Sequence, residues 1–180
     1  IKKRHPGATV VFIGPCIAKK SEVKRYKDAG KVGADYVLTF DELYAMFLAK
    51  NIDPEAMASS DVQQGSKYGK NFATSGGVSA AVQEVLAEEK FDMPVSCLKC
   101  SGAAECKKAL MLLRVGKLNE TIIEGMACEG GCVNGPAKIS DVRESVGMRR
   151  QLMLSVDDRS IADNLEMSDF KEIDMKDGRN

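Results

Sequence analysis

The fold prediction starts from one stretch, Ala8-Thr-Val-Val-Phe-Ile-Gly-Pro-Cys16. Its first six residues are apolar or β-branched, which predicts a short buried strand over residues 8–13. Gly14 and Pro15 break that strand and leave Cys16 on the loop that follows. The stretch therefore predicts a strand that delivers a thiol to a loop.

Strands and helices alternate along the rest of the chain. The further predicted strands are 35–39, 93–97 and 121–124, and the predicted helices are 41–47 with Asp41 as N-cap, 75–86, 103–115 and 141–155. Residues 51–70 are predicted to be mostly loop. This alternation predicts an α/β fold, a mostly parallel sheet flanked by helices, with ligands bound by loops at the carboxyl ends of the strands. The loops of Cys16 and Cys128 both follow strands, so we expect them on one side.

Composition excludes several classes of protein. The 180 residues include 26 basic and 26 acidic side chains, so the net charge is zero, whereas nucleic-acid binding needs an excess of cations. No apolar run approaches the roughly 20 residues that span a bilayer. The opening IKKRHPGA lacks the apolar region of a secretory signal. Six cysteines without such a signal predict the reducing cytoplasm, where thiols persist.

Cysteine is the residue type that predicts chemistry, because the single histidine, His5, makes histidine-based sites improbable. In Cys128-Glu-Gly-Gly-Cys132 the two glycines allow a tight backbone path that turns both thiolates toward one metal centre. Thiolates ligate iron–sulfur clusters, and Cys16 is the natural third ligand. The alternative is that Cys128 and Cys132 are small buried residues at a crowded turn.

Other candidate sites carry weaker signals. The group Cys97, Cys100 and Cys106 contains a C-x2-C spacing that suits zinc, a redox dithiol or iron, but buried thiols are the favoured interpretation, and Cys106 falls on the apolar face of its helix. Lys19 and Lys20 are, by themselves, typical of a solvated basic loop. Ser75-Gly-Gly77 could cradle an anion at a helix start, although close packing there is favoured.

Four segments together resemble the iron-only hydrogenases. Gly14-Pro-Cys-Ile-Ala-Lys-Lys-Ser-Glu22 resembles the motif MPCxxKKxE, and Met126-Ala-Cys-Glu-Gly-Gly-Cys132 resembles MACPGGC. Between them, residues 35–43 and 72–78 resemble the stretches DYVLTTREL and FGATGGV of that family. The resemblance covers residues 8–140 in the right order, and two cysteine motifs in register make it specific.

The resemblance implies an H-cluster, a 4Fe-4S cubane joined through one cysteine to a two-iron unit. It implies reversible H2 oxidation and proton reduction, electron exchange with a ferredoxin-type carrier, and loading by hydrogenase maturation proteins. By position, the resemblance implies that Cys16, Cys128 and Cys132 are the cubane ligands and that Cys132 is the bridge to the two-iron unit. It implies that Lys19 donates a hydrogen bond to a cyanide. Phe72 and Met126 would line the two-iron pocket.

The sequence departs from the family pattern in ways that favour a divergent branch. The motif TSCCP, which supplies a fourth cubane ligand and a proton-relaying cysteine, is absent, in keeping with a chain that starts at Ile1 in the middle of a longer protein. Gly14 replaces the methionine of the second motif, Glu129 replaces the proline of the third, and residues 134–137 replace its GGGGQP tail.

We therefore predict a C-terminal portion of the two-lobed hydrogenase catalytic domain over residues 1–156, followed by an acidic tail over 157–180 with a short helix near 161–165. The isolated chain is expected to be cluster-poor and inactive. One alternative is a non-catalytic hydrogenase-like iron–sulfur scaffold, assembly or sensory protein. Another is a zinc or redox module centred on Cys97 and Cys100.

Overall fold

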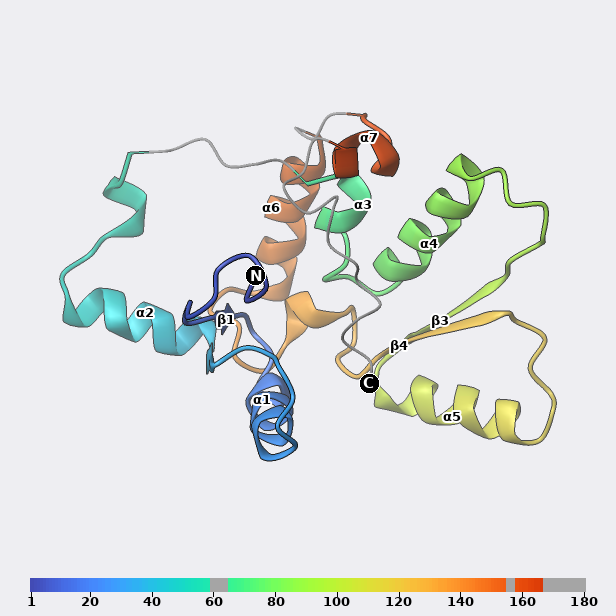
Figure 1. Cartoon of the computed structure of the whole chain (residues 1–180), viewed down its shortest axis with the longest axis horizontal. Helices are drawn as coiled ribbons and strands as arrows, with labels where there is room; N and C mark the ends of the chain where they lie inside the picture. The colour runs from blue at the N-terminus through green and yellow to red at the C-terminus, as the bar shows by residue number, and fades with distance from the viewer. Residues whose placement is uncertain (59–64, 155–157, 167–180) are drawn as a thin grey trace. The chain divides into compact units, whose positions relative to one another are not determined.

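The computed structural model describes residues 1–58, 65–154 and 158–166 (Figure 1). They form two compact units, one from 1–58 with 135–141 and the other from 65–134 with 142–154 and 158–166. Each unit holds one pair of parallel strands accompanied by helices, which confirms the α/β class. The loops of Cys16 and Cys128 follow strands of two different sheets, so the expectation of a single sheet carrying both is wrong.

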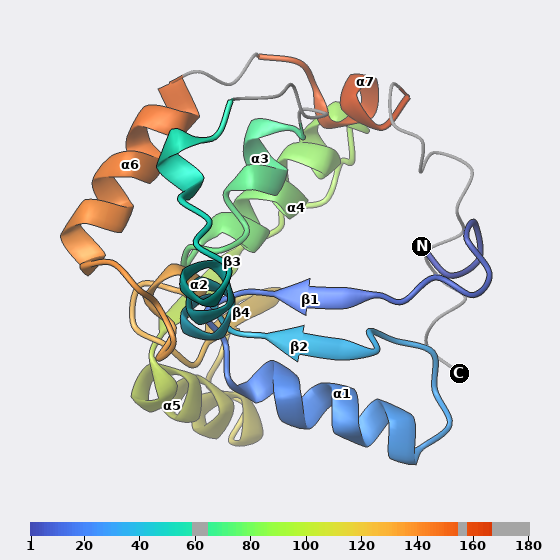
Figure 2. The same ribbon diagram turned by 90° about the vertical axis from the view of Figure 1, so that its left-hand side faces the viewer.

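The first unit is a β–α–β arrangement followed by a helix. Its elements are β1 (Val11–Ile13), α1 (Ala18–Asp28), β2 (Tyr36–Leu38), α2 (Phe40–Ala49) and the 3-10 helix η1 (Pro54–Ala56). The register pairs Val11 with Tyr36 and Ile13 with Leu38. Figure 2 shows α1 running alongside this strand pair, and α1 contacts β2. The helix therefore connects and supports the two strands.

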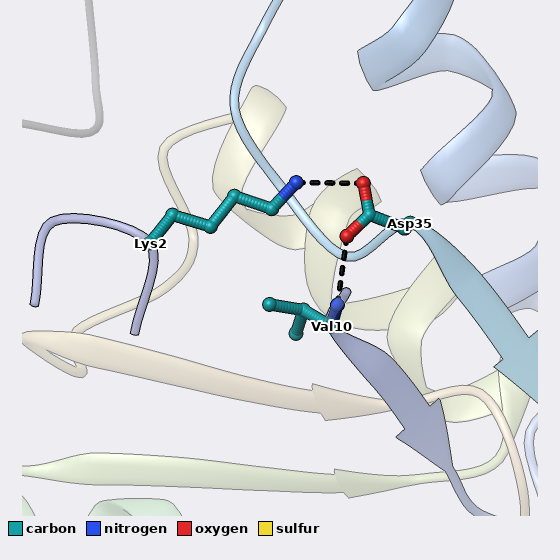
Figure 3. A network of polar contacts seen from close by, with 3 residues as sticks. All are labelled: Lys2, Val10 and Asp35. Atoms are coloured by element: carbon teal, nitrogen blue, oxygen red, sulfur yellow. Dashed lines mark hydrogen bonds and ion pairs between the residues drawn. The ribbon is translucent and has the colours of Figure 1, made fainter. Parts of the chain in front are cut away.

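Asp35 fastens the start of this sheet (Figure 3). Its carboxylate accepts hydrogen bonds from the Val10 amide at 2.7 Å and from Lys2 Nζ at 2.6 Å. Its own amide donates to the Val10 carbonyl at 2.7 Å. The hydrogen bond from Lys2 holds the pKa of Asp35 below its ordinary value. One short side chain thus joins the N-terminal segment to both strands.

Helix α2 begins at Phe40, and its N-cap is Thr39, two residues before the predicted N-cap Asp41. Thr39 and Glu42 form a capping box, in which the Glu42 carboxylate accepts from the Thr39 amide at 2.9 Å. Lys20 also donates to Glu42, and this bond together with those from Thr39 lowers the pKa of Glu42 to about 2. The first turns of α1 and α2 are therefore connected by an ion pair.

The second unit is also built on a strand pair joined by a helix. Its elements are α3 (Lys67–Lys70), α4 (Gly77–Glu88), β3 (Cys97–Ser101), α5 (Ala103–Arg114), β4 (Ile122–Met126), the 3-10 helix η2 (Cys132–Asn134), α6 (Val142–Leu154) and α7 (Ile161–Glu166). The parallel register runs from Cys97 opposite Ile122 to Ser101 opposite Met126, and α5 packs on both strands. The strand predicted at 93–97 begins only at Cys97.

Helix α7 lies within the segment predicted to be an acidic tail. Its first amides, those of Ile161 and Ala162, donate to the Glu88 carboxylate at 2.7 and 3.0 Å, and α7 packs on α4. The predicted tail beyond residue 166 lies outside the described residues. Within the described residues, no helix is long and apolar enough to cross a bilayer.

Large apolar side chains remain exposed in both units. On α5, Leu110 and Leu113 are 59% and 53% exposed, although their spacing predicts a buried face. On β1, the side chains of Val11, Phe12 and Ile13 are all exposed. Parallel sheets are normally covered on both faces, so apolar surface stays available for contacts beyond each unit.

Candidate functional site

Cys16 sits at the junction of β1 and α1. The strand pairing continues past Ile13, because the Gly14 amide donates to the Leu38 carbonyl at 3.1 Å. The Pro15 carbonyl then accepts from the Ala137 amide at 3.1 Å, and the Cys16 carbonyl accepts from the Lys19 amide at 3.4 Å. The half-buried thiol of Cys16 is thus positioned by a strand end on one side and a helix start on the other.

Gly14 is buried under the ring of Phe12. A Cβ atom at Gly14 would lie 3.0 Å from Phe12 Cε1 and 3.3 Å from its Cζ. A methionine at position 14, as in the family motif, would therefore have to push this ring aside. The glycine at this position is explained by the phenylalanine two residues earlier.

Lys19 lies in the first turn of α1, so the interpretation of Lys19 and Lys20 as loop residues is wrong. Its Nζ is 2.5 Å from Glu22 Oε2 and 5.9 Å from the centre of the Phe12 ring. All three side chains line a small cavity of about 190 Å³. The ammonium group is therefore already held by a carboxylate one helical turn away.

The loop Cys128–Cys132 is fastened by hydrogen bonds with two other segments, residues 73–75 and Ser101. The Gly130 amide donates to Ser101 Oγ at 2.8 Å, and the Gly130 carbonyl accepts from the Ser75 amide at 3.1 Å. Beyond the second cysteine, the Val133 amide donates to the Ala73 carbonyl at 3.0 Å. Three separated parts of the sequence thus meet at this loop.

Glycine is required at the centre of the loop. Gly130 and Gly131 have φ of 79° and 104°, in the left-handed region that L side chains rarely adopt. A Cβ at Gly131 would lie 2.6 Å from both the Ala73 carbonyl oxygen and the Ser75 nitrogen. The backbone of Gly131 can approach the 73–75 segment only because this residue has no side chain. In this loop Cys128 is half-buried and Cys132 is exposed.

The helix start at Ser75-Gly-Gly77, predicted either to bind an anion or to be closely packed, binds a carboxylate of the chain itself. Buried Glu124 of β4 accepts from the amides of Gly76 and Ser79 at 2.8 Å each. Burial raises the pKa of Glu124, but the hydrogen bonds from Ser79, Gly76 and Val78 outweigh it and hold this pKa below its ordinary value. Glu124 therefore locks the N-terminus of α4 onto the strand that leads to Cys128.

The sequence interpretation missed Glu124 as a structural anchor. A charged residue within the apolar stretch Ile122-Ile-Glu-Gly-Met126 was the available signal, because a carboxylate in a buried strand needs partners.

The two residues expected to line a cofactor pocket lie in the second unit. Phe72 is 48% exposed and lines an apolar cavity of about 390 Å³ together with residues of α4. Met126 is half-buried at the end of β4, and its carbonyl accepts from the Gly102 amide at 2.7 Å. Phe72 is followed directly by the segment that contacts the cysteine loop.

The other three cysteines are spread over β3 and α5. Cys97 and Cys100 are three residues apart on a strand, so they face opposite sides. Cys106 Sγ lies 3.6 Å from the Met126 carbonyl oxygen. The pKa of the Cys100 thiol is raised, chiefly by burial and to a smaller extent by the nearby Cys106. In the part of the chain that the structure describes, no three His, Cys, Asp or Glu side chains gather as metal ligands. The trio is therefore not brought together as a ligand set.

Comparison with known families defines the class of this chain. Residues 1–136 match the family described as iron only hydrogenase large subunit, C-terminal domain, and the chain belongs to that family. No match was found among curated protein sequences.

Solved structures agree with this assignment at the level of the fold. An FeFe-hydrogenase studied for oxygen inactivation, by modification and degradation of the H-cluster 2Fe subcluster, is 19% identical with a TM-score of 0.62, over 89% of this chain and 56% of that one. A variant of HydA1 from Chlamydomonas reinhardtii is 21% identical with a TM-score of 0.59, over 86% and 56%. HydA(deltaEFG), described for stepwise H-cluster assembly, is 21% identical with a TM-score of 0.56, and the match covers 86% of this chain and 55% of that one. The chain thus spans just over half the length of these hydrogenases.

Proposed function

We propose that this chain supplies part of the H-cluster site of an iron-only hydrogenase that catalyses reversible H2 oxidation and proton reduction in the cytoplasm. Electrons would be exchanged with a ferredoxin-type carrier, and maturation proteins would load the site. The observation that carries the proposal is the Cys128–Cys132 loop, where two glycines and three long-range hydrogen bonds hold two cysteine side chains, neither in a disulfide, beside the 72–78 segment.

The donor chemistry fits an iron–sulfur cubane in part. Cys16, Cys128 and Cys132 are not joined in disulfides, and cysteine thiolates are the ligands that such clusters take. A cubane with four thiolates needs one more cysteine than these three, so we propose that the chain alone is cluster-poor and inactive. The residues of 1–156 would be the catalytic-domain portion and 157–180 an appended tail.

The chain's own residues would position and shield the cofactor. When bound, the two-iron unit would supply the chemistry of H2 cleavage and formation. Lys19 would donate a hydrogen bond to an anionic group of the cofactor, with Glu22 holding its ammonium at the start of α1. Phe72 and Met126 would cover the site with apolar side chains, and Cys132 would be the cubane ligand that also holds the two-iron unit.

Infrared spectroscopy tests this proposal. The whole gene product would be coexpressed with hydrogenase maturation proteins under anaerobic conditions, and CO and cyanide stretching bands are expected. Cys132→Ser should remove these bands, whereas the matched change Cys106→Ser should keep them. Absence of the bands in protein that does carry a cubane would overturn the hydrogenase assignment.

A second candidate function is a non-catalytic iron–sulfur scaffold, assembly or sensory protein. It is favoured by the ion pair that already occupies Lys19 and by the Phe12 ring that fills the space beside Gly14. A cubane signal without CO and cyanide bands in maturation-competent cells would be its signature.

A further inference from the structure

Helix α5 presents a surface that no helix or strand of the described part of the second unit covers. Figure 1 shows α5 lying along β3 and β4, with no labelled element of this unit against its opposite side. Leu110 and Met111 on this helix are 59% and 60% exposed, and Val115 is 62% exposed. Exposed apolar side chains that cluster in this way mark interaction surfaces.

Two grooves flank the ridge formed by Lys107 and Met111, which line both. The larger, about 590 Å³, is also lined by Cys106, Leu110 and Arg114 of α5 and by Gly125 and Ala127. The smaller, about 390 Å³, is also lined by Lys108, Val115 and Lys117. We call this surface, Lys107 to Lys117 with its two grooves, the α5 groove.

The charge of the α5 groove differs from that of the whole chain. The chain is neutral, but residues 103–117 contain four basic and one acidic residue, a net charge of +3. The single acid, Glu105, is turned to the end of β3, where it accepts from the Ser101 amide at 2.7 Å. Among the described residues, no acidic side chain pairs with Lys107, Lys108, Arg114 or Lys117.

The α5 groove is continuous with the Cys128–Cys132 loop. Gly125 and Ala127, which line the larger groove, immediately flank Met126 and precede Cys128. At the start of α5, Ser101 Oγ accepts from the Gly130 amide, and a Cβ at Gly102 would lie 2.9 Å from Glu129 Cγ. A protein bound in this groove would therefore sit against the backbone that carries the proposed cluster ligands.

We propose that the α5 groove is the docking surface for an acidic electron-carrier protein, which would place apolar side chains over Leu110 and Met111 and carboxylates around Lys107 and Arg114. Cations around an apolar centre speed association and orient a complementary acidic surface. The nature of the partner rests on the proposed function, whereas the position of the surface rests on charge and exposure alone.

Binding of an oxidised acidic ferredoxin to the purified chain tests this proposal without any cofactor in the chain. Isothermal titration calorimetry in low salt should detect binding that weakens as salt rises. Lys107→Glu with Arg114→Glu should weaken binding by about tenfold or more, and Met111→Ala should weaken it at all salt concentrations. The control Lys24→Glu with Lys31→Glu, on exposed positions of the first unit, makes the same change in net charge and should stay within about twofold.

Three results would overturn the proposal. The first is an equal loss of ferredoxin affinity in the α5 variant and in the control variant. The second is no ferredoxin binding by the native chain. The third is binding of single-stranded RNA as tight as that of ferredoxin and equally dependent on α5, which would make the groove a general polyanion site. Circular dichroism of each variant confirms that it is folded. Because the readout is affinity, failure of docking is distinct from loss of the infrared bands that tests the hydrogenase function.

Discussion

The two cysteine loops of this chain are held by different kinds of contact. The Cys128–Cys132 loop is fixed by hydrogen bonds to Ala73, Ser75 and Ser101, which are 29 to 60 residues away in sequence. Beside Cys16 there are also long-range bonds, from the Gly14 amide to Leu38 and from the Ala137 amide to Pro15. Cys16 itself, however, sits between a three-residue strand and the first turn of α1, where its carbonyl accepts from the Lys19 amide. The Cys128–Cys132 loop, the second along the chain, therefore depends on tertiary structure. The Cys16 loop, the first, depends more on local structure.

The difference extends to the side chains that surround each loop. Beside the second loop, buried Glu124 and obligatory Gly131 leave the backbone little freedom. Beside the first, the close contact on Gly14 comes from the ring of Phe12, a residue that is 38% exposed. We expect the second loop to tolerate substitution far less than the first.

The largest effect is expected for Gly131→Ala. The added Cβ would collide with the backbone of residues 73–75 in a conformation with positive φ, so the second unit should lose about 2–4 kcal/mol of unfolding free energy. Urea unfolding measures this loss. Gly116→Ala is the matched control, because Gly116 also has positive φ but open space around it, and it should cost about 1 kcal/mol. Equal losses would show that the close approach to residues 73–75 does not matter.

Glu124→Gln should have the next largest effect, about 1–3 kcal/mol at neutral pH, because it removes the charge that two amides at the start of α4 stabilise. The pKa of Glu124 is lowered in the folded chain, so its contribution is complete above the unfolded pKa near 4.5 and is lost as pH falls through the folded pKa. Urea unfolding at several pH values should show native and variant converging in acid. Exposed Glu89→Gln is the control, and a difference that persists unchanged in acid would contradict this role of the charge.

Gly14→Met tests the first loop and should cost about 1–2 kcal/mol, less than Gly131→Ala, since the Phe12 ring can swing outward. The double change Phe12→Ala with Gly14→Met should cost less than the sum of the two single changes, because the smaller side chain leaves room for methionine. Strict additivity in a double-mutant cycle would show that the two positions do not compete for one space.

The sequence alone predicts those elements whose pattern lies within a short stretch of neighbouring residues. Helices α4 and α5 were predicted from apolar spacing, and the Cys128–Cys132 loop was predicted from its glycines. Helix α1 was missed because its sequence, AKKSEVKRYKD, has almost no apolar stripe and buries no residue. The start of β3 was misplaced because Cys-Leu-Lys-Cys-Ser lacks a β-branched run.

The parts of the candidate site that the sequence could not show depend on distant partners. Glu124 finds Gly76 and Ser79 across 45 to 48 residues, and no spacing rule predicts such a pairing. The capping of α7 by Glu88, across more than 70 residues, is of the same kind. Motif spacing identified the cysteines, whereas the contacts that fix them needed the fold.

The smallest expected effect belongs to Glu42→Gln, which tests the local contacts next to the first loop. Lys20 and the Thr39 amide lower the pKa of Glu42 to about 2, so its contribution is complete above the unfolded pKa near 4.5 and is lost as pH falls toward 2. Amide-exchange protection at Leu43, whose N–H donates to the Thr39 carbonyl at 3.0 Å, should drop in the variant at neutral pH and match the native chain near pH 2. Asp41→Asn changes an exposed carboxylate in the same turn and should leave this protection nearly unchanged. If both variants lowered it equally, the helix dipole rather than the capping box would be the source of the stabilisation.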